Sequence, residues 1–213
     1  HGLLDLTEIR TFKMGEVFKT EDFTVQTVSV NHSIVDAAAL IIDTPAGRVI
    51  HTGDFKIDSA PFFGQNFDPG IFKKAGDEGV LLLLSDSTNV ERCEHSQSES
   101  VVYQVFEELF AKAEGLTMVA LFSSNVARLA QVFELAKKQG KKVALCGRSM
   151  EQNFRLACES GHLKDVAGQL ISLDDLELET RKDVIVLTTG TQGEYRSALW
   201  RVSQGEHAAI DLE

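Results

Sequence analysis

The chain has 213 residues, a formal net charge of −11, and 43% hydrophobic and 25% charged residues. These fractions are typical of a globular protein with a substantial core, and no run approaches the ~18 apolar residues that a membrane-spanning helix needs. The acidic balance argues against broad electrostatic attraction to nucleic acid. It leaves open an enzyme that handles phosphate with cations and backbone amides.

The ends and the cysteines indicate the compartment. The N-terminal sequence HGLLDLTEIR has no basic flank, apolar segment or cleavage site, so we expect no signal peptide. It also lacks an initiator Met, which suggests that the chain begins inside a longer protein. The three cysteines, Cys93, Cys146 and Cys158, show no CxxC spacing. We therefore expect buried apolar thiols in a protein of the reducing cytoplasm.

The first part of the chain has the pattern of strands. The run FTVQTVSV alternates apolar and polar residues, and AALIID and RVIHTG flank a Thr-Pro-Ala-Gly sequence at 44–47 that suits a type I turn. Residues 22–53 are thus predicted to form three antiparallel strands. The continuous apolar run in GVLLLLSD, which begins at Gly79, predicts a strand buried on both faces.

Strands and helices alternate after about residue 90. A capping box, Ser96-x-x-Glu99, predicts a helix that stops at Gly115, and another helical pattern runs from Val126 to Gly140. LTMVALF, KKVALCG, QLISL and DVIVLTTG have the pattern of strands, and SMEQNFRLACES that of a helix. This order predicts a parallel sheet with helices on its faces. We therefore divide the chain into domains at 1–90 and 91–213.

Three of the predicted parallel strands end in small polar loops, at 122–125, 147–149 and 188–193. The carboxyl ends of parallel strands lie along one edge of the sheet, where ligands bind. Two of the loops lead directly into helix N-termini, whose free amides and dipole favour an anion. A phosphate-contacting edge follows from this pattern. The structural alternative is that these serines and Asn125 are ordinary helix N-caps.

Three residues at strand ends could carry chemistry. His32 follows an alternating strand, Asp54 follows Thr52-Gly53, and Asp86 follows the leucine run. A histidine at such a place is more often hydrogen-bonded than a metal ligand, and an aspartate after glycine is common in plain turns. A carboxylate at the mouth of a buried strand is the stronger signal, because burying it is costly unless it is paired or bound.

Six motifs in a fixed order carry a resemblance to a known family. They are NHSIVDA, TGDFKID, LLLSDSTN, LFSSNVARL, CGRSM and TTGTQGE, and they extend over nearly the whole chain. Together they resemble the ribonuclease J family, in the β-CASP branch of the metallo-β-lactamase superfamily. The fold implied is α/β: the C-terminal part of a metallo-β-lactamase αββα sandwich, followed by a Rossmann-like parallel-sheet β-CASP domain.

The resemblance implies a role for each matching residue. His32 matches a histidine metal ligand of the family, Asp54 the aspartate that bridges two metal ions, usually zinc, and Asp86 a catalytic acid near the reacting phosphate. Two cations held by a bridging carboxylate suit water activation and support of a leaving oxygen. In the β-CASP half, the implied RNA- or phosphate-binding residues are Ser123, Ser124, Asn125, Arg148 and Ser149.

The chain also departs from the family pattern. The His-x-His-x-Asp-His motif that supplies the first metal ligands does not occur, and His1 is the only histidine before His32. The late β-CASP histidine motifs are also missing; His162 lies in ESGHLKD, after a helix, and His207 in a polar run that we expect to be solvated. His51 and His95 fit structural roles. We therefore expect the chain to be an internal fragment that lacks full zinc occupancy and activity of its own.

The parent protein implied is a cytoplasmic, zinc-dependent ribonuclease with 5′-exonuclease and endonuclease activity, homo-oligomeric and acting on 5′-monophosphorylated RNA. One alternative is a non-catalytic RNA- or nucleotide-binding module, which the three polar loops support. Another is a small-molecule metallohydrolase of the same superfamily, for which the β-CASP half would be unnecessary. A DNA-directed relative also remains open, because recognition of the 2′-hydroxyl cannot be read from sequence.

Overall fold

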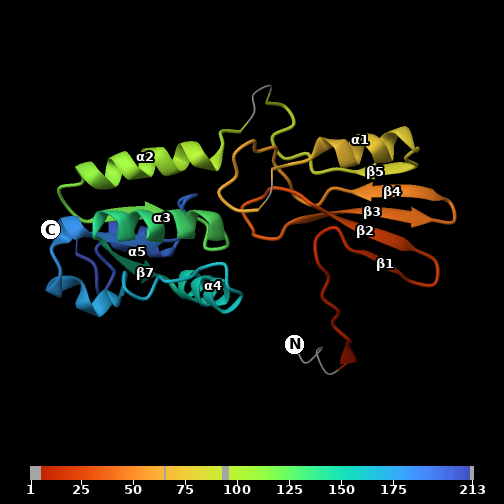
Figure 1. Cartoon of the computed structure of the whole chain (residues 1–213). Helices are drawn as coiled ribbons and strands as arrows, with labels where there is room; N and C mark the ends of the chain where they lie inside the picture. The colour runs from red at the N-terminus through yellow and green to blue at the C-terminus, as the bar shows by residue number, and fades with distance from the viewer. Residues whose placement is uncertain (1–5, 65, 93–95, 212–213) are drawn as a thin grey trace. The chain divides into compact units, whose positions relative to one another are not determined.

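The computed structural model describes residues 6–64, 66–92 and 96–211 (Figure 1). His1, Cys93 and His95 lie outside the described residues. The chain forms two compact units. The first lies within residues 1–32, 36–59 and 64–96, and the second within 33–35, 60–63 and 97–213. The predicted boundary at 90/91 stays a prediction. Two short segments of the N-terminal half, residues 33–35 and 60–63, belong to the second unit.

The first unit is a mixed sheet with one helix. Its strands are β1 (Val17–Lys19), β2 (Thr24–Ser29), β3 (Ala38–Thr44), β4 (Gly47–His51) and β5 (Leu82–Leu84), in the spatial order β1-β2-β3-β4-β5. Strands β1 to β4 pair antiparallel, as predicted for 22–53, and β5 adds parallel to β4. Helix α1 (Pro69–Asp77) packs Ala75 against a cluster that includes Val28, Ile41 and Ile50.

The prediction that the leucine run is buried on both faces was wrong. Leu81, Leu82, Leu83 and Leu84 are 63%, 48%, 59% and 45% exposed. Strand β5 lies at the edge of the sheet and, among the described strands, pairs only with β4. A continuous apolar run shows that both faces suit a dry environment. Burial also needs a layer over each face, which the described residues do not supply here.

The second unit is a parallel sheet covered on both faces. Its strands β6 (Thr117–Ala120), β7 (Lys142–Cys146), β8 (Leu170–Ile171) and β9 (Val184–Thr188) have the spatial order β6-β9-β7-β8, and all three pairings are parallel. The helices are α2 (Glu99–Lys112), α3 (Val126–Gln139), α4 (Arg148–Glu159) and α5 (Ala198–Ser203), with 3₁₀ helices η2 (Leu173–Leu178) and η3 (Arg181–Asp183). The predicted α/β class is thereby confirmed.

Alternate residues of the central strands feed two separate cores. Ile185 and Leu187 of β9 pack with residues of α2, α3 and α4, whereas Val184 and Val186 pack with Ala198 and Val202 of α5. This period of two is the signature of a strand covered on both faces. Cys146 is fully buried in the α5-side core, as expected, and Cys158 is partly buried.

Helix starts differ from the sequence prediction in two places. Helix α2 begins after Ser98, whose hydroxyl accepts from the Ser100 amide, so Ser98 and not Ser96 is the N-cap. Helix α1 was not predicted, although Asp68 caps it and Pro69 occupies its first turn. An Asp-Pro pair of this kind is a standard helix-start signal, and it could have identified α1 from sequence.

Candidate functional site

One candidate edge lies in the first unit, where three strands end together. Because β2 and β4 both run antiparallel to β3, and β5 runs parallel to β4, the carboxyl ends of β2, β4 and β5 share one edge of the sheet. His32, Asp54 and Asp86 each follow one of these strands within a few residues. The topology therefore brings the three predicted site residues to a single edge.

Backbone hydrogen bonds join the loops that carry His32 and Asp54. The Lys56 amide donates to the carbonyl oxygen of Asn31 at 2.8 Å, within an isolated antiparallel bridge between these two residues. The Lys56 ammonium lies 3.3 Å from a carboxylate oxygen of Asp58, whose side chain is fully buried. A buried carboxylate held by such a pair fixes the loop after β4.

Thr52 and Asp86 connect the ends of β4 and β5. The Thr52 amide donates to the Leu84 carbonyl oxygen at 3.0 Å, and the Asp86 amide donates to the Thr52 hydroxyl oxygen, also at 3.0 Å. That hydroxyl donates in turn to the Gly53 carbonyl oxygen at 2.7 Å. Thr52 thus uses its side chain as both donor and acceptor, and the loop carrying Asp86 is held against the turn that carries Asp54.

The Asp86 carboxylate is held in its ionised form. One oxygen accepts from the Thr88 amide at 2.8 Å and the other from the Phe55 amide at 3.4 Å. Hydrogen bonds from Thr88, and more weakly from Phe55, hold the pKa of Asp86 below its usual range, and the nearby charge of His32 lowers it further. Partial desolvation opposes this shift. Asp86 is therefore negative at neutral pH and oriented by its neighbours.

Gly53 makes the turn that places Asp54. Its φ is +60°, and a Cβ built there would lie 2.8 Å from the Ala38 carbonyl oxygen at the start of β3. Only glycine fits both the left-handed backbone and this close approach. Asp54 itself is exposed at the surface of the first unit, and His32 is partly exposed.

The first edge does not by itself complete a metal site. Zinc in proteins takes three protein ligands at a catalytic site and four at a structural one. The described part of the chain contains no group of three or more His, Cys, Asp or Glu side chains arranged to hold a metal ion. His32 and Asp54 have the donor chemistry that zinc prefers, but with the described residues alone they do not form a full ligand set.

The second candidate edge lies in the parallel sheet of the second unit. The order β6-β9-β7 places the loops at 122–125, 189–193 and 147–149 beside one another at the carboxyl ends of the strands. A Cβ at Gly147 would lie 3.6 Å from the Thr189 hydroxyl oxygen, so the loops after β7 and β9 are in near contact. All five predicted RNA-contacting residues lie on this edge.

The helix that follows each loop begins in a different way. The Asn125 side chain is 4% exposed and accepts from the Arg128 amide at 3.1 Å, which makes it the N-cap of α3. Helix α4 begins after Gly147, and no side chain caps its first-turn amides. Arg148 and Ser149 are exposed beside those amides. Of these two helix starts, only that of α4 has first-turn amides without a side-chain cap. The Asn125 side chain serves as the N-cap of α3.

Ser123 and Ser149 are joined by a residue that the sequence analysis did not single out. The Asn153 side-chain nitrogen donates to the Ser123 hydroxyl oxygen and to the Ser149 carbonyl oxygen, each at 3.0 Å. Asn153 lies inside α4, where nothing in the sequence marks it as more than a surface residue of a helix. Its role becomes visible only when β6 and β7 are placed in one sheet.

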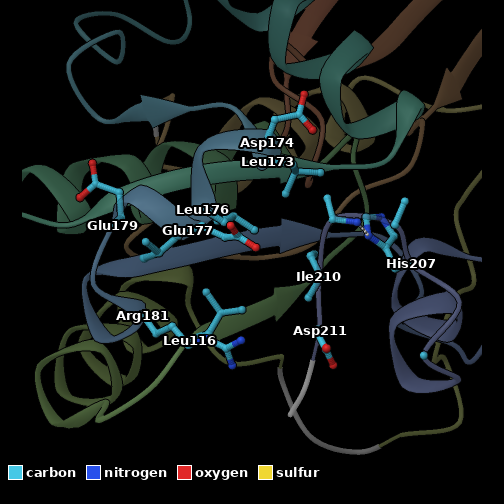
Figure 2. Close-up of a pocket in the computed structure, with 14 residues that line it drawn as sticks. Leu116, Leu173, Asp174, Leu176, Glu177, Glu179, Arg181, His207, Ile210 and Asp211 are labelled. Atoms are coloured by element: carbon cyan, nitrogen blue, oxygen red, sulfur yellow. Dashed lines mark hydrogen bonds between the residues drawn. The ribbon is translucent and has the colours of Figure 1, made fainter.

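The second unit also has a cavity, which lies on the α5 side of its sheet (Figure 2). It has a volume of about 860 Å³, with an apolar floor that includes Leu116, Leu176 and Ile210. Its lining carries four carboxylates, which would repel a phosphate, and one guanidinium: Asp174, Glu177, Glu179 and Asp211, with Arg181. None of the predicted site residues lines it.

His207 lines this cavity, so the expectation that it is solvated was wrong. Its Nε2 lies 3.3 Å from the Cys146 sulfur, and it is partly buried. Burial lowers the pKa of His207 and raises the pKa of the Cys146 thiol. Both groups are therefore neutral at neutral pH, and the pair is not an activated thiolate–imidazolium couple. His51 accepts from the Gly53 amide at 3.0 Å, a structural contact.

No helix among the described residues has both the length and the apolar character to span a membrane.

Comparisons with known proteins agree with the motifs. Residues 114–213 match the family described as "Ribonuclease J, beta-CASP domain". The chain is 39% identical over 194 residues to ribonuclease J of Helicobacter pylori (strain B128), covering 90% of this chain and 28% of that protein. It is 42% identical over 196 residues to ribonuclease J of Mycolicibacterium smegmatis, covering 92% and 34%. For ribonuclease J of Synechocystis the identity is 38% over 212 residues, covering 99% and 33%.

A solved structure supports the fold alone. A protein of unknown function from Enterococcus faecalis V583 superposes with a TM-score of 0.61 at 20% identity, covering 87% of this chain and 46% of that one. The chain spans about a third of the length of the ribonuclease J relatives it matches. The resemblance drawn from the six motifs is confirmed: the chain is similar to ribonuclease J over nine-tenths or more of its length, and its residues 114–213 match the model of the ribonuclease J β-CASP domain.

Proposed function

We propose that this chain is part of a metal-dependent ribonuclease that hydrolyses phosphodiester bonds of RNA. The observation that carries the proposal is the similarity to ribonuclease J over nine-tenths or more of the chain. The two candidate edges support it, because each gathers polar or acidic residues at the carboxyl ends of strands, where α/β proteins bind ligands.

Within this proposal, His32 and Asp54 contribute two ligands to a centre that binds two zinc ions when complete. Its other ligands would come from outside the described residues, because those residues do not supply them. Zinc bound there would supply Lewis acidity at the scissile phosphate. The chain's own part is to hold the loops of Asp54 and Asp86 together through Thr52.

Asp86 is better suited to orient a neighbouring group than to accept a proton as a general base. A carboxylate whose pKa is lowered by hydrogen bonds is a weak proton acceptor at neutral pH. It remains negative and accepts from the Thr88 and Phe55 amides. We propose that it orients a water or a positively charged group at the reacting phosphate, as its place at the first edge allows.

The second edge would hold the RNA backbone. The first-turn amides of α4, the Arg148 guanidinium and the Ser123 and Ser149 hydroxyls suit phosphate oxygens. We propose 5′-monophosphorylated RNA as the partner, with both 5′-exonuclease and endonuclease activity, in a cytoplasmic homo-oligomer. Asn125 is retained only as the N-cap that positions this loop.

The test is a chimera in which the matching segment of Helicobacter pylori ribonuclease J is replaced by this chain. We expect the chimera to cleave 5′-labelled RNA in the presence of zinc. Asp54→Ala should reduce cleavage by more than about a hundredfold, because even outer partners of metal ligands are worth 10- to 100-fold. A folded chimera that binds two zinc ions but leaves RNA intact would contradict the ribonuclease assignment.

A second candidate is a non-catalytic RNA-binding module. The observation that favours it is the phosphate-suited edge in the second unit, where three polar loops and the uncapped start of α4 lie together. It predicts that the chain binds RNA at low salt, and that Asp54→Ala changes neither binding nor cleavage in the chimera.

A further inference from the structure

Asn153 bridges the two loops that follow β6 and β7. Its side-chain nitrogen carries two hydrogens, and the structure gives each one an acceptor: the Ser123 hydroxyl oxygen and the Ser149 carbonyl oxygen. A backbone carbonyl can only accept, so the contact with Ser149 fixes which end of the amide faces these loops. The nitrogen must therefore also donate to Ser123.

This contact decides what the Ser123 hydroxyl can do. A serine hydroxyl has one proton to donate and lone pairs with which to accept. Because Ser123 accepts from Asn153, its own proton stays available for donation. The described residues show no hydrogen bond in which the Ser123 hydroxyl donates, and the side chain is partly exposed at the edge of the sheet.

The same contact fixes the spacing between two loops that are distant in sequence. Ser123 follows β6 and Ser149 lies in the first turn of α4, and in the sheet β9 separates β6 from β7. A hydrogen bond across that gap holds the Ser123 hydroxyl beside the uncapped first turn of α4. Donors arranged in advance for an anion lose less entropy when it binds.

We propose that Asn153 is a positioning residue for RNA binding: it holds Ser123 beside the start of α4 and orients the Ser123 hydroxyl to donate to a phosphate oxygen of the RNA backbone. The inference rests on the proposed function, since it names the residue that organises the second edge. Asn153 does not contact the RNA itself; it acts through Ser123.

A double-mutant cycle tests this role. The affinity of the chain for a 5′-monophosphorylated single-stranded oligoribonucleotide is measured by fluorescence anisotropy at low salt, for wild type, Ser123→Ala, Asn153→Ala and the double variant. We expect each single variant to weaken binding by about tenfold or more, the usual effect of losing one hydrogen bond to a charged group. The double variant should be no weaker than either single one, because both remove the same donor.

Two further variants separate positioning from general stability. Gln152→Ala, at the exposed neighbouring position on α4, is the matched control and should bind as wild type does. Asn153→Asp should bind more weakly than Asn153→Ala, because a carboxylate would accept the Ser123 proton and add negative charge at the edge. A purely structural role for Asn153 would lower the melting temperature and give losses that add to those of Ser123→Ala.

The outcomes distinguish this inference from the function on which it rests. If wild type shows no affinity for the oligoribonucleotide at low salt, both the RNA-binding edge and the role of Asn153 are overturned. If wild type binds but Asn153→Ala binds equally well, or if the losses of the single variants add in the double variant, only the positioning role is overturned. The positioning role is supported if the two single variants lose equal affinity and the double variant loses no more than either of them.

Discussion

Gly53 shows how one residue determines the direction in which the chain leaves β4. Its φ is +60°, and a Cβ at this position would lie 2.8 Å from the Ala38 carbonyl oxygen. We expect Gly53→Ala to lower the free energy of unfolding by about 2 kcal/mol or more, because the left-handed conformation alone costs an L-residue about 1–2 kcal/mol and the carbonyl must also move. Urea denaturation followed by circular dichroism measures the change.

Gly64→Ala is the matched control for this prediction. Gly64 also has a positive φ, +79°, but a Cβ there would meet no atom within 4 Å. Its substitution should cost only the left-handed backbone conformation, about 1–2 kcal/mol. Equal losses at the two glycines would mean that the approach to Ala38 contributes nothing, and that the turn before Asp54 tolerates a side chain.

At the scale of elements, Asn125 separates helix capping from RNA contact. Its side chain is buried and accepts from the Arg128 amide at the start of α3. Asn125→Ala should therefore lower the free energy of unfolding by about 1 kcal/mol, within the range of about 0.5–2 for lost caps. Asn125→Asp keeps a capping oxygen and places a negative charge at the helix N-terminus, so it should retain the stability of wild type.

The same Asn125→Asp variant decides between the two interpretations of the loop. If Asn125 serves only as a cap, its anisotropy titration with RNA should overlay that of wild type. A loss of affinity of tenfold or more at unchanged melting temperature would show that the residue also faces phosphate, since an added carboxylate repels it. Thermal unfolding and anisotropy on one preparation give both readouts.

Element by element, the sequence predicted what depends on local pattern and missed what depends on packing partners. Alternation in 22–53 and continuous apolar runs after 116 located β2, β3, β4, β6, β7 and β9. The burial of β5 could not be predicted, because an apolar run does not say whether a layer covers it. The capping box was misplaced because two serines, Ser96 and Ser98, lie close before the helix, and the helix begins directly after Ser98, whose hydroxyl accepts from the Ser100 amide.

The residues of the candidate site also fall into those that local pattern predicted and those that only packing contacts reveal. Polar residues after apolar strands identified His32, Asp54 and Asp86, and the topology then placed all three at one edge. Thr52 and Asn153 were missed because their function lies in contacts across the sheet, with Asp86 and Ser123, that no local motif encodes. The metal and RNA roles of these residues stay predictions.

At the scale of the whole molecule, the two units differ in how well their sheets are covered. Strands β7 and β9 have helices on both faces and contribute to two cores, and every residue of β9 is buried. Strand β4 of the first unit lies beside β5, whose leucines are exposed. Local stability follows buried apolar contact, so amide exchange should differ between the two sheets.

We expect amide hydrogens of β3 and β4 to exchange roughly tenfold or more faster than those of β7 and β9, a difference of about 1.4 kcal/mol in opening free energy. Hydrogen–deuterium exchange with mass spectrometry at pH 7 measures this for peptides covering 38–51, 142–146 and 184–188. Equal protection in the two sheets would show that the exposed leucines of β5 do not weaken the first unit.

Val186→Ala tests whether the cores act separately. Val186 is fully buried in the α5-side core, and its truncation should cost about 2 kcal/mol. The hydrophobic cluster of the first unit shares no residue with the two of the second. Exchange should therefore accelerate at 142–146 and 184–188 and stay unchanged at 38–51. Acceleration of all three by the same factor would mean that the chain opens as one cooperative unit, and that the separate cores do not open independently.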